Sequence, residues 1–350
     1  MRFIHIADVH YGAIPDRGKP WSETRALEIK ETFKDMLQLV ERSRVDLLLI
    51  AGDLFHAPAT DQDLMELDYL LGKLTKARTV IIAGNHDYIG EGSPLERFRF
   101  RSKTIYLPKG KVSNVYLKDL NTCITGYSYP TYEVKENVFL GVTPAKPGAI
   151  NILLAHGGDE KHIPFNKAEL KNAGFDYVAL GHIHKPDILA DNLMAYSGAL
   201  EPIDHNDIGK RGYIFGEIGT TNKIVFKQFN KRSYYNLGLE INTDCTNEMI
   251  IDTLTAGIEK LGKDNIYRVL LRGRKSNSLK IDLRSLEKHY SIYEVVENVY
   301  RDYDIEQLLI ENKGNLIGRY IETYIDKTDD EKCKKALHYG VEAILASGNR

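Results

Sequence analysis

The sequence predicts an α/β protein with three parts, and three observations support this prediction. Apolar runs of strand length alternate with amphipathic helical segments through the first half of the chain. The runs "VDLLLIAG" and "TVIIAG" are almost continuously apolar, as strands covered by helices usually are. A chain of 350 residues is longer than one hydrophobic core usually holds. We therefore expect a large α/β domain over residues 1–229, a smaller α+β domain over 230–303 and a helical tail over 304–350.

The first helix shows how the elements of the large domain are identified. Residues 22–43 carry apolar side chains at the spacing that places them on one face of a helix. Ser22 is the expected N-cap, and Glu23 lies in the first turn, where a negative charge is favourable. The expected buried face consists of Ile29, Phe33, Met36, Leu37 and Val40.

The other elements follow from the same periodicities. In the large domain, strands are expected at 2–7, 45–52, 78–84, 151–156 and 177–182, hairpin-like strands within 103–128, antiparallel strands within 187–229, and helices at 61–77 and 166–173. In the smaller domain, strands are expected at 234–241, 267–273 and 292–299, and helices at 246–261 and 282–289. The tail is expected to be helical, with a break near "KTDDEK".

Composition narrows the class of protein. The chain is 43% hydrophobic and 27% charged, which is typical of a globular protein, and its net charge of -2 neither requires nor excludes a polyanionic partner. Its three cysteines are far apart and form no CxxC pair, so reduced thiols and a cytoplasmic location are expected. The start "MRFIHIAD" enters a strand at once, and runs such as "LLLIAG" are too short to cross a bilayer. We therefore expect neither a signal peptide nor a membrane segment.

Metal-capable side chains follow five of the predicted core strands. In open α/β sheets, functional sites lie beyond the carboxyl ends of the strands. Residues scattered from 8 to 184 are therefore expected to meet in one place. The side chains concerned are Asp8, His10, Asp53, Asn85, His86, Asp87, His156, His182 and His184.

The residue types favour two adjacent divalent cations. Carboxylate, amide and imidazole ligands without a thiolate suit Mn, Fe or Zn better than a soft metal or an all-oxygen calcium site. Asp53 stands alone at its strand end and is the natural bridging ligand, which would hold the ions roughly 3.5–4 Å apart. Gly52, Gly84 and Gly181 let the backbone turn sharply beside the ions.

Each motif taken alone has an ordinary explanation. Aspartate and histidine are common at strand ends, and the two histidines of "GHIH" can be surface residues. A turn accounts for the first two residues of "GNHD" but not for His86 and Asp87. The occurrence of all the motifs together, each at a strand end, favours the metal site.

The order of these motifs resembles that of the calcineurin-like metallophosphoesterase superfamily, and within it that of the SbcD-type DNA repair nucleases. The motifs are "IADVHYG", "AGDLFH", "AGNHDY", His156 and "GHIHKP". These motifs cover residues 8–186, about half of the chain. The resemblance implies a two-sheet sandwich flanked by helices, followed by a capping domain that resembles the family only loosely. It implies two divalent metal ions, most often Mn, with Fe, Zn or Mg as alternatives.

The resemblance also assigns the ligands. The first metal would be held by Asp8, His10, Asp53 and His184. The second metal would be held by Asp53, Asn85, His156 and His182.

Three further residues have catalytic roles by this resemblance. His86 would lie over the scissile phosphate and protonate or stabilise the leaving oxygen, and Asp87 would orient its ring and raise its pKa. His56 would contact the nucleic acid phosphate, where protein phosphatases of the superfamily carry an arginine-bearing motif instead. A turn role for Asp87 and a helix-start role for His56 remain alternatives.

Two basic stretches are candidates for DNA contact. Residues 97–111 and 268–280 each carry several arginines and lysines without an acid, as paths for phosphates do. In an extended segment, Arg97, Arg99 and Arg101 would share one face and Phe98 and Phe100 the other. Charged residues that protect strand edges are an equally common explanation.

Three functions compete at this point. The first is a DNA exonuclease or single-strand endonuclease in double-strand break repair. The second is a small-molecule phosphodiesterase or phosphatase, which the motifs alone do not exclude. The third is a non-catalytic binding subunit, which is disfavoured because no expected ligand is missing from the sequence.

The resemblance implies two protein partners. An SbcC-type, SMC-like ATPase would dock on the helical tail, where Leu308, Leu309, Leu316, Ile317 and Tyr320 form an apolar stripe. A tail packed on its own domain is the alternative. A homodimer would use the helix at 61–77, although its leucines can equally belong to the core.

Overall fold

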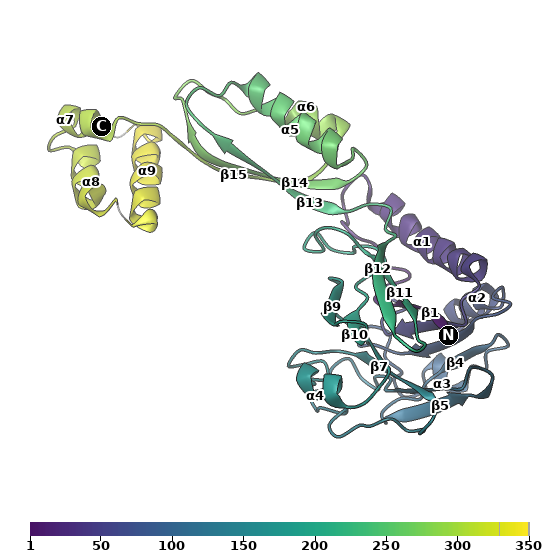
Figure 1. Ribbon diagram of the computed structural model, residues 1–350. Coiled ribbons are helices and arrows are strands. Elements are labelled where there is room, and N and C mark those ends of the chain that lie inside the picture. The colour runs from purple at the N-terminus through teal and green to yellow at the C-terminus, as the bar shows by residue number, and fades with distance from the viewer. Residues whose placement is uncertain (329, 349–350) are drawn as a thin grey trace. The chain divides into compact units, whose positions relative to one another are not determined.

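The apolar runs of the first half form two six-stranded mixed sheets in the computed structural model, which describes residues 1–328 and 330–348 (Figure 1). The strand orders are β12-β11-β1-β2-β3-β4 in the first sheet and β5-β6-β7-β8-β10-β9 in the second. Strands β1 to β4 run parallel to one another, and so do β6, β7, β8 and β10. The bounds are β1 Arg2–Ile6, β2 Leu47–Ala51, β3 Arg78–Ile82, β4 Thr104–Tyr106, β5 Ser113–Leu117, β6 Thr122–Gly126, β7 Ile150–His156, β8 Tyr177–Gly181, β9 Asp187–Ala190, β10 Met194–Tyr196, β11 Gly212–Glu217 and β12 Lys223–Gln228.

The two sheets bury a common core between them. Along β1, Phe3 points into this core, whereas Ile4 points to the opposite face, because side chains alternate along a strand. Ile152 and Leu154 of β7 belong to the same buried cluster, and the ring of Tyr177 in β8 lies 4.7 Å from the ring of Phe3. Both faces of the central strands are therefore buried, and the predicted α/β sandwich flanked by helices is confirmed.

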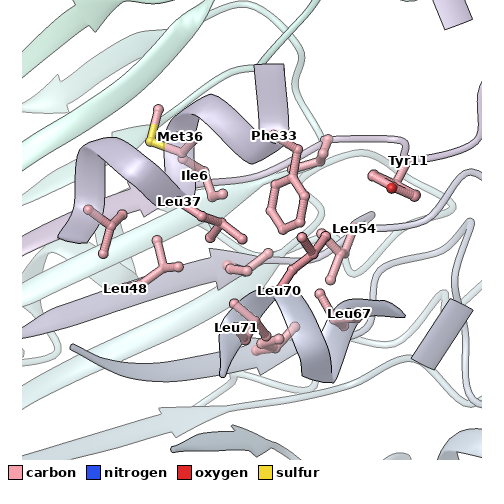
Figure 2. Close-up of a cluster of buried hydrophobic side chains, with 14 of the residues drawn as sticks. Ile6, Tyr11, Phe33, Met36, Leu37, Leu48, Leu54, Leu67, Leu70 and Leu71 are labelled. Atoms are coloured by element: carbon pink, nitrogen blue, oxygen red, sulfur yellow. The ribbon is translucent and has the colours of Figure 1, made fainter. Parts of the chain in front are cut away.

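Helices α1 (Ser22–Ser43) and α2 (Asp61–Leu71) cover the outer face of the first sheet. Phe33 and Met36 of α1 and Leu67 of α2 belong to one buried cluster with residues of the strands beneath, among them Ile6 and Leu48 (Figure 2). The predicted N-cap is wrong: Ser22 is already helical, and its hydroxyl donates to the carbonyl of Pro15 at 2.7 Å. The predicted helix at 61–77 ends earlier, at Leu71.

Short elements complete this unit. They are α3 (Pro94–Arg97), the 3-10 turn η1 (Lys118–Leu120) and α4 (Lys167–Asn172), which packs on the outer face of the second sheet. The strands expected as a hairpin within 103–128 divide between the two sheets: β4 adds to β3 in parallel, and only β5 and β6 pair antiparallel.

The chain divides into two compact units, Met1–Tyr234 and Tyr235–Arg350. The second unit contains a three-stranded sheet in the order β13-β14-β15, in which β14 and β15 are parallel. Its elements are β13 Tyr234–Ile241, α5 Asn247–Leu261, β14 Ile266–Lys275, α6 Arg284–His289, β15 Ser291–Arg301, α7 Ile305–Glu311, α8 Leu316–Tyr324, η2 Ile325–Lys327 and α9 Glu331–Ala346. The separation of this unit into a capping domain and a tail remains our proposal.

Helices α7, α8 and α9 form the predicted helical tail, of which residues 329, 349 and 350 lie outside the described range. Most of the predicted apolar stripe packs within the tail: Ile317 is buried against Leu337, and Leu308 and Tyr320 are partly buried beside them. Leu316 and Ile310 stay exposed. None of the described helices is long and apolar enough to cross a membrane.

Candidate metal centre

The carboxyl ends of β1, β2, β3, β7 and β8 carry the predicted ligands. The loops after β1 and β2 are joined by backbone hydrogen bonds, from Asp8 to Gly52 at 3.1 Å and from His10 to Asp53 at 3.0 Å. The second sheet is joined to the first at Asp8, whose carboxylate accepts from the backbone N–H of His182 at 3.0 Å. The strand ends of both sheets therefore converge, as parallel strands predict.

One half of the cluster contains His10 and His184. Their Nε2 atoms are 3.1 Å apart, and Nε2 of His10 is 3.8 Å from Oδ2 of Asp53. Ligating atoms of Asp8, His10 and His184 all lie within 4.8 Å of one another. Together with Asp53, these residues are the set expected for the first metal.

The other half contains His156, Asn85 and His182. Nε2 of His156 lies 3.0 Å from Oδ1 of Asn85 and 3.4 Å from Oδ2 of Asp53. Nδ1 of His182 lies 3.1 Å from the same Asn85 oxygen. Asp53 therefore lies between the two halves, which is where a bridging ligand is expected.

The chemistry of the histidines fits a cation. Nδ1 of His184 donates to the Asp207 carboxylate at 3.0 Å, which leaves the lone pair of His184 on Nε2. That atom faces Nε2 of His10 at 3.1 Å. Two imidazole lone pairs at this distance repel each other unless a proton or a cation lies between them, so this half of the site suits a divalent metal.

Burial and mutual charge set the protonation of the metal-free cluster. Burial opposes the charged form of His156, but the Asp53 carboxylate outweighs it and raises the pKa of His156 to about 9. Burial also opposes the charged form of Asp53, but His156 lowers the pKa of that carboxyl far below its usual value. Burial raises the pKa of Asp8 to about 6. Imidazole binds a metal only in its neutral form, so the metal affinity of this cluster should fall as the pH falls.

The backbone of the site is held in an uncommon conformation. Four predicted ligands have a positive φ, a region that aspartate and histidine enter more readily than β-branched residues do. They are Asp8 (50°), His10 (48°), Asp53 (50°) and His182 (94°). Gly84 is required for a different reason: a Cβ at this position would lie 2.7 Å from Nε2 of His156. The loops are therefore fitted closely to the ligands.

His86 and His56 lie together at the open side of the cluster. Their rings stack with centroids 5.4 Å apart, and His86 is 4.9 Å from the ring of His10. Nδ1 of His86 lies 3.3 Å from the carbonyl oxygen of His56, to which it can donate. The backbone N–H of His86 donates to Oδ1 of Asp53 at 2.8 Å, which fixes this loop to the cluster.

The Asp87 carboxylate does not hold the ring of His86 in the way that was expected. Among the described residues, no hydrogen bond joins its carboxylate to the ring of His86. The carboxylate accepts instead from the backbone N–H groups of Gly84 at 2.7 Å and Leu54 at 2.9 Å. Burial, followed by the charge of Asp53, raises the pKa of Asp87 to about 7. Asp87 therefore ties together the loops after β2 and β3, close to the turn role that was its alternative.

Two carboxylates of the site were missed from the sequence. Asp207 accepts from His184, and Oδ2 of Asp159 lies 2.6 Å from Nε2 of His182. Asp159 also bonds Nδ1 of His162 at 2.9 Å. Metal-binding histidines usually donate their second ring nitrogen to such a group. This rule predicts that each metal-binding histidine has a carboxylate partner, but the loops that carry Asp159 and Asp207 show no sequence motif by which the partner could be found.

Replacement of Asp159 by alanine is expected to weaken metal binding and to lower kcat/KM by about 10–100-fold, the usual effect of losing the partner of a metal-binding histidine. The carboxylate holds the ring of His182 with Nδ1 toward Asn85. Isothermal titration with Mn²⁺ measures the first effect. Glu160→Ala, at the exposed neighbouring position, is the matched control and should leave both quantities unchanged. Equal metal affinity and equal kcat/KM of the two variants would contradict the role of Asp159 as the partner of His182.

Comparison with protein families decides the class of the site. The model of the calcineurin-like phosphoesterase family matches residues 1–186, which include every predicted ligand. The chain belongs to this family. It is thus a member of a group of metal-dependent phosphoesterases, and its aspartate and histidine clusters are able to bind the metal.

Two relatives of this phosphoesterase extend the comparison. It is 27% identical over 309 residues to YhaO of Bacillus subtilis (strain 168), an uncharacterized metallophosphoesterase, with 78% of this chain and 72% of YhaO covered. It is 30% identical over 225 residues to the DNA double-strand break repair protein Mre11 of Methanocaldococcus jannaschii, with 59% of this chain and 58% of Mre11 covered.

The two basic stretches of the phosphoesterase differ in their surroundings. In the first, Phe98 and Phe100 pack toward the core while Arg99 and Arg101 are exposed, as the alternation predicts. A cavity of about 970 Å³ lies beside it, lined in part by Lys73, Arg99, Arg101 and Lys103. In the second stretch, acids of the following segment pair with the cations: Arg268 with Glu294, Arg274 with Asp302, and Lys275 with Glu297.

Proposed function

We propose that this phosphoesterase is a two-metal nuclease that hydrolyses DNA phosphodiesters in double-strand break repair, with Mn²⁺ as its preferred cofactor. The observation that carries the proposal is the open side of the metal centre, where His56 and His86 stand beside the ligand cluster. The similarity to an archaeal protein of DNA double-strand break repair supports it. Membership of the SbcD-type branch is part of the same proposal.

The proposed mechanism assigns a task to each group. Divalent ions held by the seven ligands would lower the pKa of a bound water and neutralise charge on the phosphate. A protonated His86 can donate from Nδ1 to the carbonyl of His56 and keep its second proton on Nε2. That proton would pass to the leaving oxygen, which departs as a hydroxyl group. His56 would contact the phosphate from the exposed side.

DNA would approach along the first basic stretch. Arg99 and Arg101 are exposed, and Lys73 and Lys103 line the same cavity. A polyanion gains most from cations that are not already neutralised by acids. Acids neutralise cations of both stretches. Among the described residues, Arg97 and Lys109 of the first stretch pair with Asp61 and Glu96, which is two of its six cations. Three of the five cations of the second stretch pair with Glu294, Asp302 and Glu297, so the second stretch is less suited to DNA.

Protein partners are proposed on the resemblance alone. An SMC-like ATPase would use the exposed Leu316 and Ile310 of the tail, since the rest of the apolar stripe is occupied within the tail. A homodimer would use the outward face of α2, where Met65 and Tyr69 are exposed. Both residues also line the cavity proposed for DNA, so a homodimer there would compete with DNA. The leucines of α2 do not take part, because they are buried in the core.

The wild-type protein with Mn²⁺ is expected to digest end-labelled DNA, and His86→Ala to reduce kcat by about 10²–10⁴-fold, the usual contribution of a general acid. Gel analysis of labelled strands measures both. His205→Ala, at a histidine outside the cluster, is the matched control and should retain activity.

Hydrolysis of bis-p-nitrophenyl phosphate and of p-nitrophenyl phosphate, measured in parallel, separates the competing functions. Cleavage of the diester with DNA left intact would contradict the nuclease proposal and favour a small-molecule phosphodiesterase. Preference for the monoester would favour a phosphatase.

A further inference from the structure

An exposed aromatic ring lies beside the reacting side of the metal centre. Tyr132 is 50% exposed, a high value for a large aromatic residue within a folded unit. Its ring centroid lies 5.8 Å from that of His86 and 5.8 Å from that of His162. Tyr132 is neither a predicted metal ligand nor part of the buried core, so neither role explains the position of its ring.

The backbone that carries Tyr132 is fixed on both sides. Before it, Tyr129 is fully buried, and its hydroxyl donates to the carbonyl of His156 at 3.0 Å. After it, Val134 is buried and exchanges backbone hydrogen bonds with the loop 161–163. The exposed ring is therefore presented by a segment that is held in place, so the packing of a ligand on it costs the protein little conformational entropy.

The orientation of the ring leaves room for a flat ligand. The planes of Tyr132 and His86 are inclined at 74°, and those of Tyr132 and His162 at 85°. Among the described residues, no aromatic ring stacks flat on Tyr132. A half-exposed aromatic residue next to a site proposed to bind phosphate is an arrangement with which proteins hold unpaired bases of single strands.

We propose that Tyr132 stacks on the base of the nucleotide adjoining the scissile phosphate, and that the site therefore favours unpaired DNA. This inference rests on the proposed nuclease function. The phosphate at His86 and the base at Tyr132 would belong to neighbouring parts of one nucleotide. In a duplex, neighbouring base pairs cover both faces of each base, so a base must leave the stack before it can lie on Tyr132.

Single-stranded oligonucleotides with and without the base next to one cleavable linkage test the proposal. Loss of a stacked base typically costs about 1–3 kcal/mol, so kcat/KM of the wild type should favour the intact strand by about 5–150-fold. Tyr132→Leu should reduce this ratio to near one, whereas Tyr132→Phe, which keeps the ring, should preserve it. Tyr339→Leu removes an exposed tyrosine of α9, in the second unit, and is the matched control, with the wild-type ratio expected.

Two outcomes would overturn the proposal. One is a wild-type ratio near one; the other is an equal loss of activity on both strands in Tyr132→Leu, which would indicate that the ring only supports His86.

A second measurement does not depend on cleavage. Fluorescence of 2-aminopurine at the tested position should be quenched when the strand binds the Asp53→Asn protein, and less so when Tyr132→Leu is added. Unquenched binding would also overturn it, whereas stacking without any DNA hydrolysis would contradict only the nuclease function.

Discussion

Asp53→Asn is expected to abolish hydrolysis, with kcat/KM lowered by about a thousandfold or more, which corresponds to about 4 kcal/mol of transition-state stabilisation. Asp53 lies between the two halves of the cluster, 3.8 Å from Nε2 of His10 and 3.4 Å from Nε2 of His156. The amide is neutral and a poor bridging ligand, so both cations should bind more weakly. Hydrolysis of bis-p-nitrophenyl phosphate and the metal content after dialysis against Mn²⁺ measure the two effects.

The substitution is expected to spare the fold. The amide oxygen can still accept the hydrogen bond from the backbone of His86 that Asp53 accepts now. Asp252→Asn, at an exposed position of α5, makes the same chemical change outside the site and should behave as wild type. Retention of two bound cations and of more than a tenth of the activity in Asp53→Asn would show that this carboxylate is not the bridge.

Gly84→Ala is also expected to impair the metal centre, although it adds only one methyl group. The new Cβ would lie 2.7 Å from Nε2 of His156 and 2.7 Å from the backbone nitrogen of Asp53, and would also collide with the Asp53 carboxylate. These clashes can be relieved only if Asp53, which both halves of the site share, moves. Displacements of about 1 Å commonly cost 10²-fold in rate, so we expect kcat to fall by at least about 100-fold.

Gly219→Ala is the matched control, because a Cβ at Gly219 meets no atom within 4 Å. This variant should retain wild-type metal content, kcat and thermal stability. Circular dichroism of Gly84→Ala should show whether the fold persists. Wild-type kcat in Gly84→Ala would mean that the loop can move away from Asp53, and that the close fit of the site is unnecessary.

The site was predictable from the sequence because parallel strands bring distant residues together. Asp8, Asp53, Asn85 and His156 follow different strands, and the period of each apolar run already indicates where its strand ends. Helical spacing predicted the buried face of the helix at 22–43, and the alternation of an extended segment predicted that Arg99 and Arg101 share a face opposite Phe98 and Phe100. In each case a short stretch of sequence predicts the element, and the order of the strands in the sheets then determines which residues lie close together.

The remaining features depend on contacts that no local pattern encodes. Asp159 and Asp207 reach their histidines from irregular loops, so their positions follow from the path of the chain rather than from a motif. Asp87 was misassigned because the sequence places it beside His86, whereas its carboxylate turns back to the backbone of Leu54. The pairing of β4 with β3, in place of the expected hairpin, is likewise determined by tertiary packing.

Anomalous scattering from crystals soaked in Mn²⁺ tests the two-cation centre most directly. Two peaks roughly 3.5–4 Å apart are expected, as in other two-metal hydrolytic sites. Both should be within bonding distance of Asp53, one beside His10 and His184 and the other beside His156. A single peak, or two peaks that do not share Asp53, would contradict the bridged centre on which the proposed chemistry depends.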